Sequence, residues 1–262
     1  MNRGPLRIIN AKLALMLCAA GLFIALWAMS LKLLDVSGLV ARQPSQVWNY
    51  MFSGPESATN RREVIEHVGE TLRDFGIGYA AGLLSAFALA TGFSLSLTVE
   101  RIVMPTAMML RSIPVIVLTP LITLLFGTGI GGITAIVTLV VFLPAMANIL
   151  YGVRTAQNEY RDLVRVNGGS ELMLLYKAAL PGSLPAILTS ARISVPAAVT
   201  GAMIGEWLAT GTGVGGFIAR SSSSFGYDAM WASAIVITLL TMLVYTGVSI
   251  VDTLVQQRFI AA

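Results

Sequence analysis

The segment from Arg161 to Pro185 reads RDLVRVNGGSELMLLYKAALPGSLP. Charged side chains are interspersed among its leucines and valines, the pair Gly168 and Gly169 divides it, and Pro181 stands near its end. Glycine permits a backbone bend, and proline ends or interrupts a helix. The segment therefore predicts two helical pieces that meet at the glycine pair.

The apolar residues on each side of the bend recur at helical spacing, which predicts two short amphipathic helices at residues 160–167 and 171–180, the second closed by Pro181. Such helices suit two environments. They can lie flat on a membrane surface, or they can fit a groove on a partner protein. Periodicity alone supports the two interpretations equally.

The rest of the chain is strongly apolar. Of its 262 residues, 56% are hydrophobic and 11% are charged, and the mean hydropathy is +0.79. Soluble domains carry about a quarter charged residues, so this composition is typical of an integral membrane protein. The net charge of +4 does not indicate nucleic-acid binding, because the basic residues are scattered between apolar runs.

Six apolar runs are long enough to cross about 30 Å of hydrocarbon as helices. They cover residues 13–33, 72–97, 102–126, 130–151, 186–210 and 229–254. The first run is longer than the apolar core of a secretory signal, so we expect a retained span. The sequence therefore predicts an all-α membrane protein with about six transmembrane helices.

The polar segments between these runs define the expected organisation. Residues 1–67 comprise the first helix and an outer segment whose last part begins the second span, and residues 68–258 form the core. A glycine turn at 127–132 joins the third and fourth runs, and a polar loop occupies residues 152–182. We expect one membrane domain over residues 1–262.

The distribution of arginine and lysine predicts the orientation. If the amino terminus is cytoplasmic, the inner side of the membrane collects more of these residues than the outer side. An even number of spans then places the carboxyl terminus on the inner side as well. The segment that contains the glycine pair also faces the cytoplasm in this arrangement.

The spacing from Asp162 to Pro181 resembles the signature loop of binding-protein-dependent ABC transporter permeases. In that pattern Glu-Ala-Ala is followed after three residues by Gly, after nine more by Ile, and one residue later by Leu-Pro. The corresponding residues here are Asp162, Leu163, Val164, Gly168, Ala178, Leu180 and Pro181. The glycine and the Leu-Pro pair match in identity, and Asp162 keeps the acidic charge. Leu163 and Val164 are larger than the alanines they replace.

Further blocks at residues 110–131, 181–194 and 205–237 are similar to the nitrate, sulfonate and taurine type of these permeases, and the resemblance extends over residues 71–259. It implies a type I-like importer fold in the bacterial inner membrane. The implied partners are a second permease subunit, identical or related, two cytoplasmic ATPase subunits and a periplasmic solute-binding protein. The implied solute is a small organic or inorganic anion such as a sulfonate or nitrate.

The same resemblance assigns the glycine-divided segment to a coupling helix that inserts into a cleft on the ATPase. The residues in this role would be Asp162, Leu163, Val164, Gly168, Gly169, Leu180 and Pro181. ATP and Mg²⁺ would bind the partner ATPase, so this chain would hold no cofactor and would not be an enzyme. The sequence agrees with that expectation in lacking a phosphate-binding G-x-x-x-x-G-K-[ST] motif.

Two other patterns in the sequence do not support a catalytic or metal site. GTGVGG at residues 211–216 matches a dinucleotide-binding pattern but follows a membrane span instead of a strand, so we interpret it as an outer-side turn. His67 stands beside Glu66 and Glu70 without a second histidine or a cysteine, so we expect an exposed histidine near a helix start and no metal. Cys18, the only cysteine, is expected to be buried.

Charged residues within the apolar runs are the remaining chemical signal, because a charge at mid-bilayer costs about 2.5–3.5 kcal/mol on insertion scales. Arg111, Arg192 and Glu206 are the cases. They can form interhelical ion pairs or reach toward the interface, and a cation near the solute path would also suit an anion. We hypothesise that Arg111 lines the translocation path, and Arg192 and Glu206 are further candidates for it. Asn148 can serve there or in an interhelical hydrogen bond.

Glycine pairs at residues 78–82 (GYAAG) and 201–205 (GAMIG) permit close helix packing, either within the subunit or between subunits. Two other classes of protein are less compatible with the sequence. A secondary transporter or channel would be expected to place paired acidic residues at mid-membrane, and here only Glu206 qualifies, off-centre toward the outer end of its span. A membrane enzyme would need a nucleophile and a base at plausible spacing, which the sequence lacks.

Overall fold

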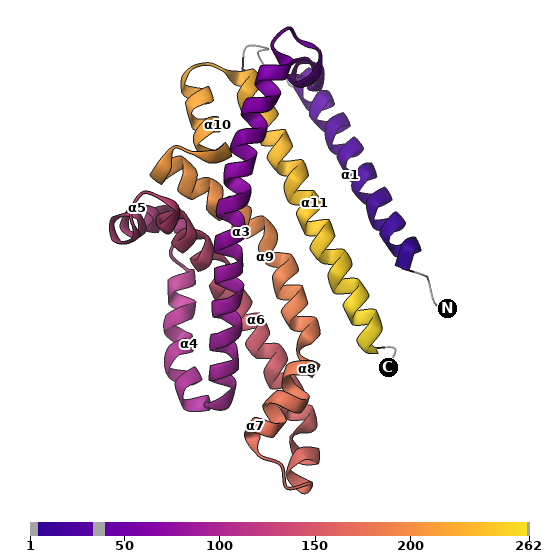
Figure 1. Cartoon of the computed structure of the whole chain (residues 1–262), viewed down its shortest axis with the longest axis vertical. Helices are drawn as coiled ribbons and strands as arrows, with labels where there is room; N and C mark the ends of the chain where they lie inside the picture. The colour runs from indigo at the N-terminus through magenta and orange to yellow at the C-terminus, as the bar shows by residue number, and fades with distance from the viewer. Residues whose placement is uncertain (1–4, 34–39, 261–262) are drawn as a thin grey trace.

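The computed structural model describes residues 5–33 and 40–260, which are almost entirely helical and contain no strand (Figure 1). The long helices are α1 (Pro5–Leu33), α3 (Ser57–Leu95), α4 (Leu97–Arg111), α5 (Val115–Phe126), α6 (Ile130–Val166), α9 (Leu184–Gly205), α10 (Gly213–Ser223) and α11 (Tyr227–Ile260). Short α-helices are α2 (Pro44–Trp48), α7 (Glu171–Leu174) and α8 (Leu180–Gly182). Three π-helical turns are η1 (Asn49–Ser53), η2 (Leu175–Ala179) and η3 (Glu206–Thr210). The predicted all-α class is therefore confirmed.

The membrane spans agree with the prediction except for the third. Within residues 5–33 and 40–260, five helical segments are long and apolar enough to cross a bilayer, and α4 with α5 forms a sixth span only as a pair bent by 107°. The bend falls at Ser112–Pro114, where Pro114 disfavours helical backbone at Ile113. The third apolar run is thus a broken span, with α5 turned across the bundle (Figure 1).

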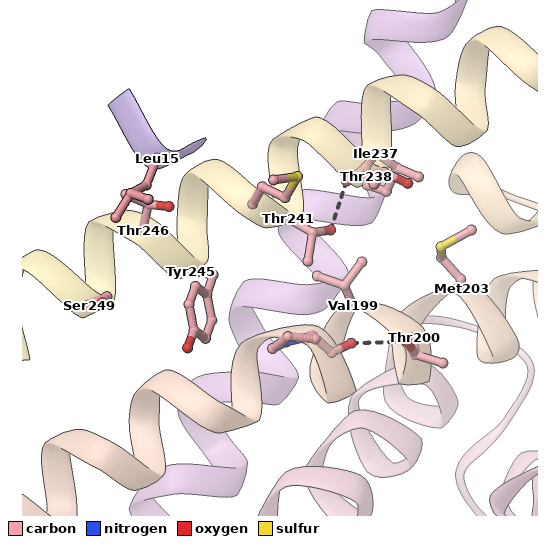
Figure 2. Close-up of a pocket in the computed structure, with 12 residues that line it drawn as sticks. Leu15, Val199, Thr200, Met203, Ile237, Thr238, Thr241, Tyr245, Thr246 and Ser249 are labelled. Atoms are coloured by element: carbon pink, nitrogen blue, oxygen red, sulfur yellow. Dashed lines mark hydrogen bonds between the residues drawn. The ribbon is translucent and has the colours of Figure 1, made fainter. Parts of the chain in front are cut away.

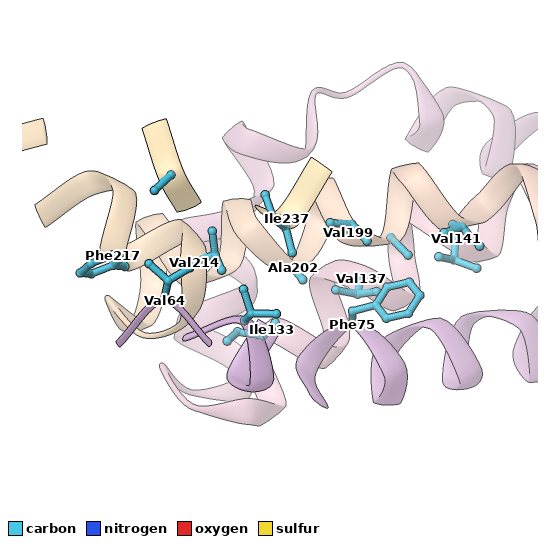
Figure 3. Close-up of a cluster of buried hydrophobic side chains, with 14 of the residues drawn as sticks. Val64, Phe75, Ile133, Val137, Val141, Val199, Ala202, Val214, Phe217 and Ile237 are labelled. Atoms are coloured by element: carbon cyan, nitrogen blue, oxygen red, sulfur yellow. The ribbon is translucent and has the colours of Figure 1, made fainter. Parts of the chain in front are cut away.

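α6 is the central helix of the bundle, and one face of it is completely buried. Ile133, Val137 and Val141 recur every fourth residue on that face. Figure 3 shows them among side chains from α3, α9 and α10, including Phe75 and Val199. Helical spacing of branched apolar residues therefore creates the core, and the other spans are arranged around α6.

Both glycine pairs lie within the subunit, which decides between the two alternatives left open by the sequence. A Cβ at Gly78 or Gly82 of α3 would collide with valines of α6, and Gly201 and Gly205 of α9 face α6 from another side. The absence of side chains there lets α3 and α9 approach α6 closely. These glycines are therefore not available to a second subunit.

The amino-terminal part packs loosely on the rest. α1 contacts α11 through Trp27, whose ring stacks on Trp231 with centroids 5.3 Å apart. Cys18 of α1 is exposed, contrary to prediction, because this part of α1 has little protein packed against it. α3 begins at Ser57, which confirms that the polar segment leads into the second span by a helix.

Candidate functional site

The glycine-divided segment forms a helical turn that projects beyond the other helices at one end of the bundle (Figure 1). We call residues 160–182 the coupling turn. The predicted helix at 160–167 is wrong as a separate element, because α6 continues unbroken to Val166. No proline falls between residues 151 and 166, so α6 can continue directly to the bend.

The bend itself lies at the predicted glycines. Gly168 has a φ of +75°, a left-handed conformation that glycine adopts without strain. The amides of Gly168 and Gly169 donate to the carbonyls of Arg165 and Val164 at 2.9 and 2.8 Å, and these bonds close the end of α6. The chain then restarts at Ser170, whose hydroxyl caps α7 by accepting from the amide of Met173.

The second helical piece runs without a break through α7, η2 and α8 and ends at Gly182, which agrees within one residue with the predicted end at Pro181. Only Ser183 separates it from α9, which begins at Leu184. The return arm of the coupling turn therefore passes almost directly into a membrane span.

The coupling turn has a buried face and an exposed apolar face. Leu174, Leu175 and Ala179 are buried, with Leu175 and Ala179 in one cluster with residues of α6. The opposite face exposes 55% of Leu172 and 64% of Tyr176. Its apolar side chains need a cover that the bilayer cannot supply if the turn stands in water. Among the predicted coupling residues, the exposed ones are Asp162, Leu163, Gly168 and Pro181, and the half-buried ones are Val164, Gly169 and Leu180.

Charged groups flank this apolar face. Arg165 donates to Glu171 across the bend at 2.8 Å, and both side chains are more than half exposed. This hydrogen bond, with a smaller contribution from the charge of Arg161, lowers the pKa of Glu171. The combination of exposed apolar residues and rim charges is the usual anatomy of a protein-binding surface.

Arg154 of α6, six residues before the coupling turn, ties this end of α6 to neighbouring helices, and the sequence did not single it out. Its guanidinium donates to Glu100 at 2.6 Å and to the carbonyl of Phe93 at 3.0 Å. These bonds join α6 to the turn between α3 and α4. A basic residue just beyond an apolar run was the available signal, but its acidic partner lies 54 residues away in sequence.

The four candidate pathway residues are not brought together by the fold. Arg192 of α9 forms an ion pair with Asp252 of α11 at 2.9 Å, and Asp252 is fully buried. Asn148 donates to the hydroxyl of Ser190 at 2.9 Å. Both contacts are interhelical, as one interpretation of the sequence expected. Asp252 was missed, although an aspartate near the end of the last apolar run could have suggested a partner for Arg192.

Arg111 is the last residue of α4 and is exposed beside the bend. It lines a small cavity of about 120 Å³ with Ile113 of the bend and Pro144 of α6. Arg111 has no ion-pair partner within residues 5–33 and 40–260. Among the candidate pathway residues, Arg111 is the exposed basic one without an ion pair in these ranges.

Glu206 lies at the start of η3, near the opposite end of the bundle from the coupling turn, and is fully buried. The GTGVGG segment beside it is only partly a turn, because α10 begins at Gly213 and runs to Ser223. His67 is half-buried instead of exposed, since it stacks on Phe217 and contacts Glu70 at 3.0 Å. No group of possible metal ligands occurs in the part of the chain that the structure describes.

A larger cavity of about 690 Å³ lies between α9 and α11 and was not predicted (Figure 2). Its lining is largely apolar, with Val199, Met203 and Tyr245 among the residues drawn. The hydroxyls of Thr200 and Thr241 donate to carbonyls of their own helices, so they are satisfied without an occupant. None of the four candidate pathway residues lines this cavity.

Residues 78–261 match the family model described as the binding-protein-dependent transport system inner membrane component. The chain belongs to this family. It is therefore a multi-pass inner-membrane permease subunit of an ABC transporter, as the signature-loop resemblance implied.

Curated relatives agree with this assignment. The formylaminopyrimidine transport permease protein ThiX of Halalkalibacterium halodurans is 32% identical over 182 residues, or 70% of this chain and 73% of the relative. A probable ABC transporter permease protein of Haemophilus influenzae is 27% identical over 76% of this chain and 84% of its own length. The taurine transport system permease protein TauC of Escherichia coli is 25% identical over 81% of this chain and 78% of its own length. Permeases named for aliphatic sulfonates and nitrate are also similar.

Proposed function

We propose that this permease subunit transmits the closure of two cytoplasmic ATPase subunits to the membrane, and that the coupling turn is where the ATPase docks. The observation that carries the proposal is the exposed apolar face of the turn, with Leu172 and Tyr176 at its centre and charged residues at its rim. The buried face holds the turn on α6, so a force applied to it reaches the span. ATP and Mg²⁺ would be bound by the partner, and this chain would hydrolyse nothing.

The proposed cycle follows from the connections of the turn. α6 enters it and α8 leaves it for α9, so two membrane spans move when the ATPases draw together. Rigid-body movement of packed helices can then alternate the access of a solute site between the two sides of the membrane. A second permease subunit and a periplasmic binding protein would complete the importer. Both termini would lie on the cytoplasmic side.

We propose a small organic or inorganic anion as the solute, with Arg111 on its path. The unpaired guanidinium at the break between α4 and α5 supports this, because broken spans expose backbone groups and are used along translocation paths. The similarity to permeases named for taurine, aliphatic sulfonates and nitrate supports the same class.

Docking is tested by purifying the complex from its native host in mild detergent. Leu172→Glu places a charge in the centre of the apolar face and is expected to remove the ATPase from the purified permease. Asn158→Glu is the matched control, since Asn158 is exposed on α6 just before the turn and should leave the ATPase bound. If the Leu172→Glu permease retains its ATPase, the coupling turn is not the docking site. If uptake proceeds without ATP, a transporter independent of an ATPase becomes the better explanation.

The solute path is tested by ATP-dependent uptake of a sulfonate and of nitrate. Arg111→Ala is expected to reduce uptake of the transported anion at least tenfold in an assembled complex, and Arg111→Lys should retain part of it. Arg101→Ala removes an exposed arginine from the first turns of the same helix and should transport normally. Unchanged uptake by the Arg111→Ala complex would remove Arg111 from the path.

A further inference from the structure

A buried polar cluster lies at the end of the bundle opposite the coupling turn, and the proposed function does not use it. α10 begins there, and its first amides donate to side chains of α3 and η3. The bonds are Gly213 N to Glu70 Oε2 at 2.7 Å, Val214 N to Thr71 Oγ1 at 2.9 Å and Gly215 N to Glu206 Oε2 at 2.8 Å. We call Glu70, Thr71 and Glu206 the α10 clamp.

The α10 clamp differs from ordinary helix capping. A cap is usually supplied by the residue that precedes the helix, yet Thr212 in that position makes no capping bond. The acceptors come instead from elements distant in sequence. Thr71 also donates its hydroxyl to Glu206 Oε2 at 2.9 Å, so α3 and η3 are bonded to each other as well as to α10. Both side chains are fully buried.

Packing fixes the carboxyl group of Glu206 as tightly as hydrogen bonding does. A Cβ at Gly213 would collide with this carboxyl group, and Gly213 has a φ of +62° that favours glycine in any case. Glu206 has no ion-pair partner in the described ranges, and its Oε1 atom is buried without a hydrogen bond. Glu206 therefore acts by holding α3 and α10 in place, through the two hydrogen bonds that its Oε2 atom accepts from Thr71 and Gly215.

α6 connects the α10 clamp to the coupling turn. This helix has 37 residues, which corresponds to a length of about 55 Å. Near its start, Ile133 and Ile136 pack against Gly205, the residue directly before Glu206. At its other end α6 enters the coupling turn. One continuous helix therefore touches both sites.

We propose that Thr71 and Glu206 are positioning residues of the transport cycle: they tie α10 and α3 to the far end of α6, so that this end of the bundle changes state together with the coupling turn. The proposal rests on the proposed function. Without the clamp, α10 is released from α3 and η3, and ATP hydrolysis by the partner proceeds without matching movement of solute.

The test uses the complete complex in liposomes, with its ATPase and binding protein, and measures uptake and ATP hydrolysis in the same preparation. Glu206→Ala is expected to reduce uptake at least tenfold while ATP hydrolysis stays within twofold of wild type. Glu206→Gln should retain at least half of the uptake, because its amide oxygen can accept the same two hydrogen bonds. Thr71→Val should resemble Glu206→Ala, and Thr71→Ser should resemble wild type.

The outcomes separate this inference from the proposed function. A wild-type complex without ATP-dependent uptake would contradict the proposed function itself. If the wild-type complex transports, normal uptake by Glu206→Ala or Thr71→Val contradicts the proposed positioning role of these residues. An equal fall of uptake and ATP hydrolysis in these variants contradicts it as well. If Glu206→Ala does not assemble, Thr71→Val decides, because it removes one hydroxyl with little change in shape. Failure of Thr71→Val to assemble would show a purely structural role and would also overturn the proposal.

Discussion

The two ends of α6 are built in opposite ways. At the coupling turn, apolar side chains face outward, and the ion pair between Arg165 and Glu171 is more than half exposed. At the α10 clamp, polar side chains face inward, and Thr71 and Glu206 are fully buried and bonded to backbone amides. An exposed apolar face outside the bilayer can be covered by a second protein, whereas buried polar groups must be satisfied within the chain.

This difference teaches where substitutions should act. Changes on the exposed face of the coupling turn should alter assembly with a partner and leave the stability of the chain almost unchanged. Changes in the α10 clamp should alter stability, or the coordination of the spans, even when the partner still binds. The predictions below compare similar substitutions at the two ends.

The largest effect is expected at Gly213. Gly213→Ala should destabilise the chain by about 2–5 kcal/mol, because overpacking against the Glu206 carboxyl group adds to the cost of a left-handed alanine. Thermal unfolding in detergent measures the change. Gly69→Ala is the matched control, since a Cβ there meets nothing within 4 Å on the nearby surface of α3. Similar unfolding temperatures for the two variants would contradict the described geometry of the α10 clamp.

A smaller effect is expected at Gly168, which has the same left-handed backbone conformation as Gly213 but no neighbouring side chains around it. A Cβ at Gly168 has nothing within 4 Å, so Gly168→Ala adds only left-handed strain, about 1–2 kcal/mol. The same unfolding experiment should therefore rank Gly168→Ala between wild type and Gly213→Ala. Binding of the ATPase should weaken as well, because the strain is relieved by a change in the bend. If Gly168→Ala unfolds at a lower temperature than Gly213→Ala, the expected difference between the two glycine positions is contradicted.

The smallest effect is expected at Glu171. Its exposed ion pair with Arg165 should contribute less than about 0.5 kcal/mol to folding and be lost in high salt. Since the pKa of Glu171 is lowered in the folded chain, this contribution is present above the ordinary pKa of glutamate and disappears as the pH falls through the lowered value. Glu171→Gln should remove that acid-dependent part. If Glu171→Gln lowers the unfolding temperature near neutral pH by more than Gly168→Ala does, the ion pair between Arg165 and Glu171 contributes more to stability than expected.

The sequence predicted those features of the fold that depend on local pattern. Runs of apolar residues located the spans, and Gly168 with Gly169 located the bend of the coupling turn. The angle at Ser112–Pro114 was not predictable, because a proline shows where a helix is interrupted but not where the next one points. Spacing alone therefore could not show that α5 turns across the bundle.

The candidate site was predicted less completely, because it depends on tertiary contacts. α10 was missed since its glycine- and serine-rich sequence has little helix propensity, and its first turn is held by side chains of α3 and η3. The pairing of Arg192 with Asp252 joins two spans whose register the sequence does not reveal. The pathway role of Arg111, and the docking role of the coupling turn, stay predictions.

The length of α6 has a consequence for how a solute would leave the importer. The apolar run of this helix ends near Leu150, yet the helix continues to Val166, about 24 Å further. The headgroup layer occupies only about 5–8 Å beyond the hydrocarbon. A motor docked on the coupling turn would thus stand clear of the lipid, with a water-filled space between them. Cargo could diffuse sideways into the cytoplasm through that space without crossing the motor.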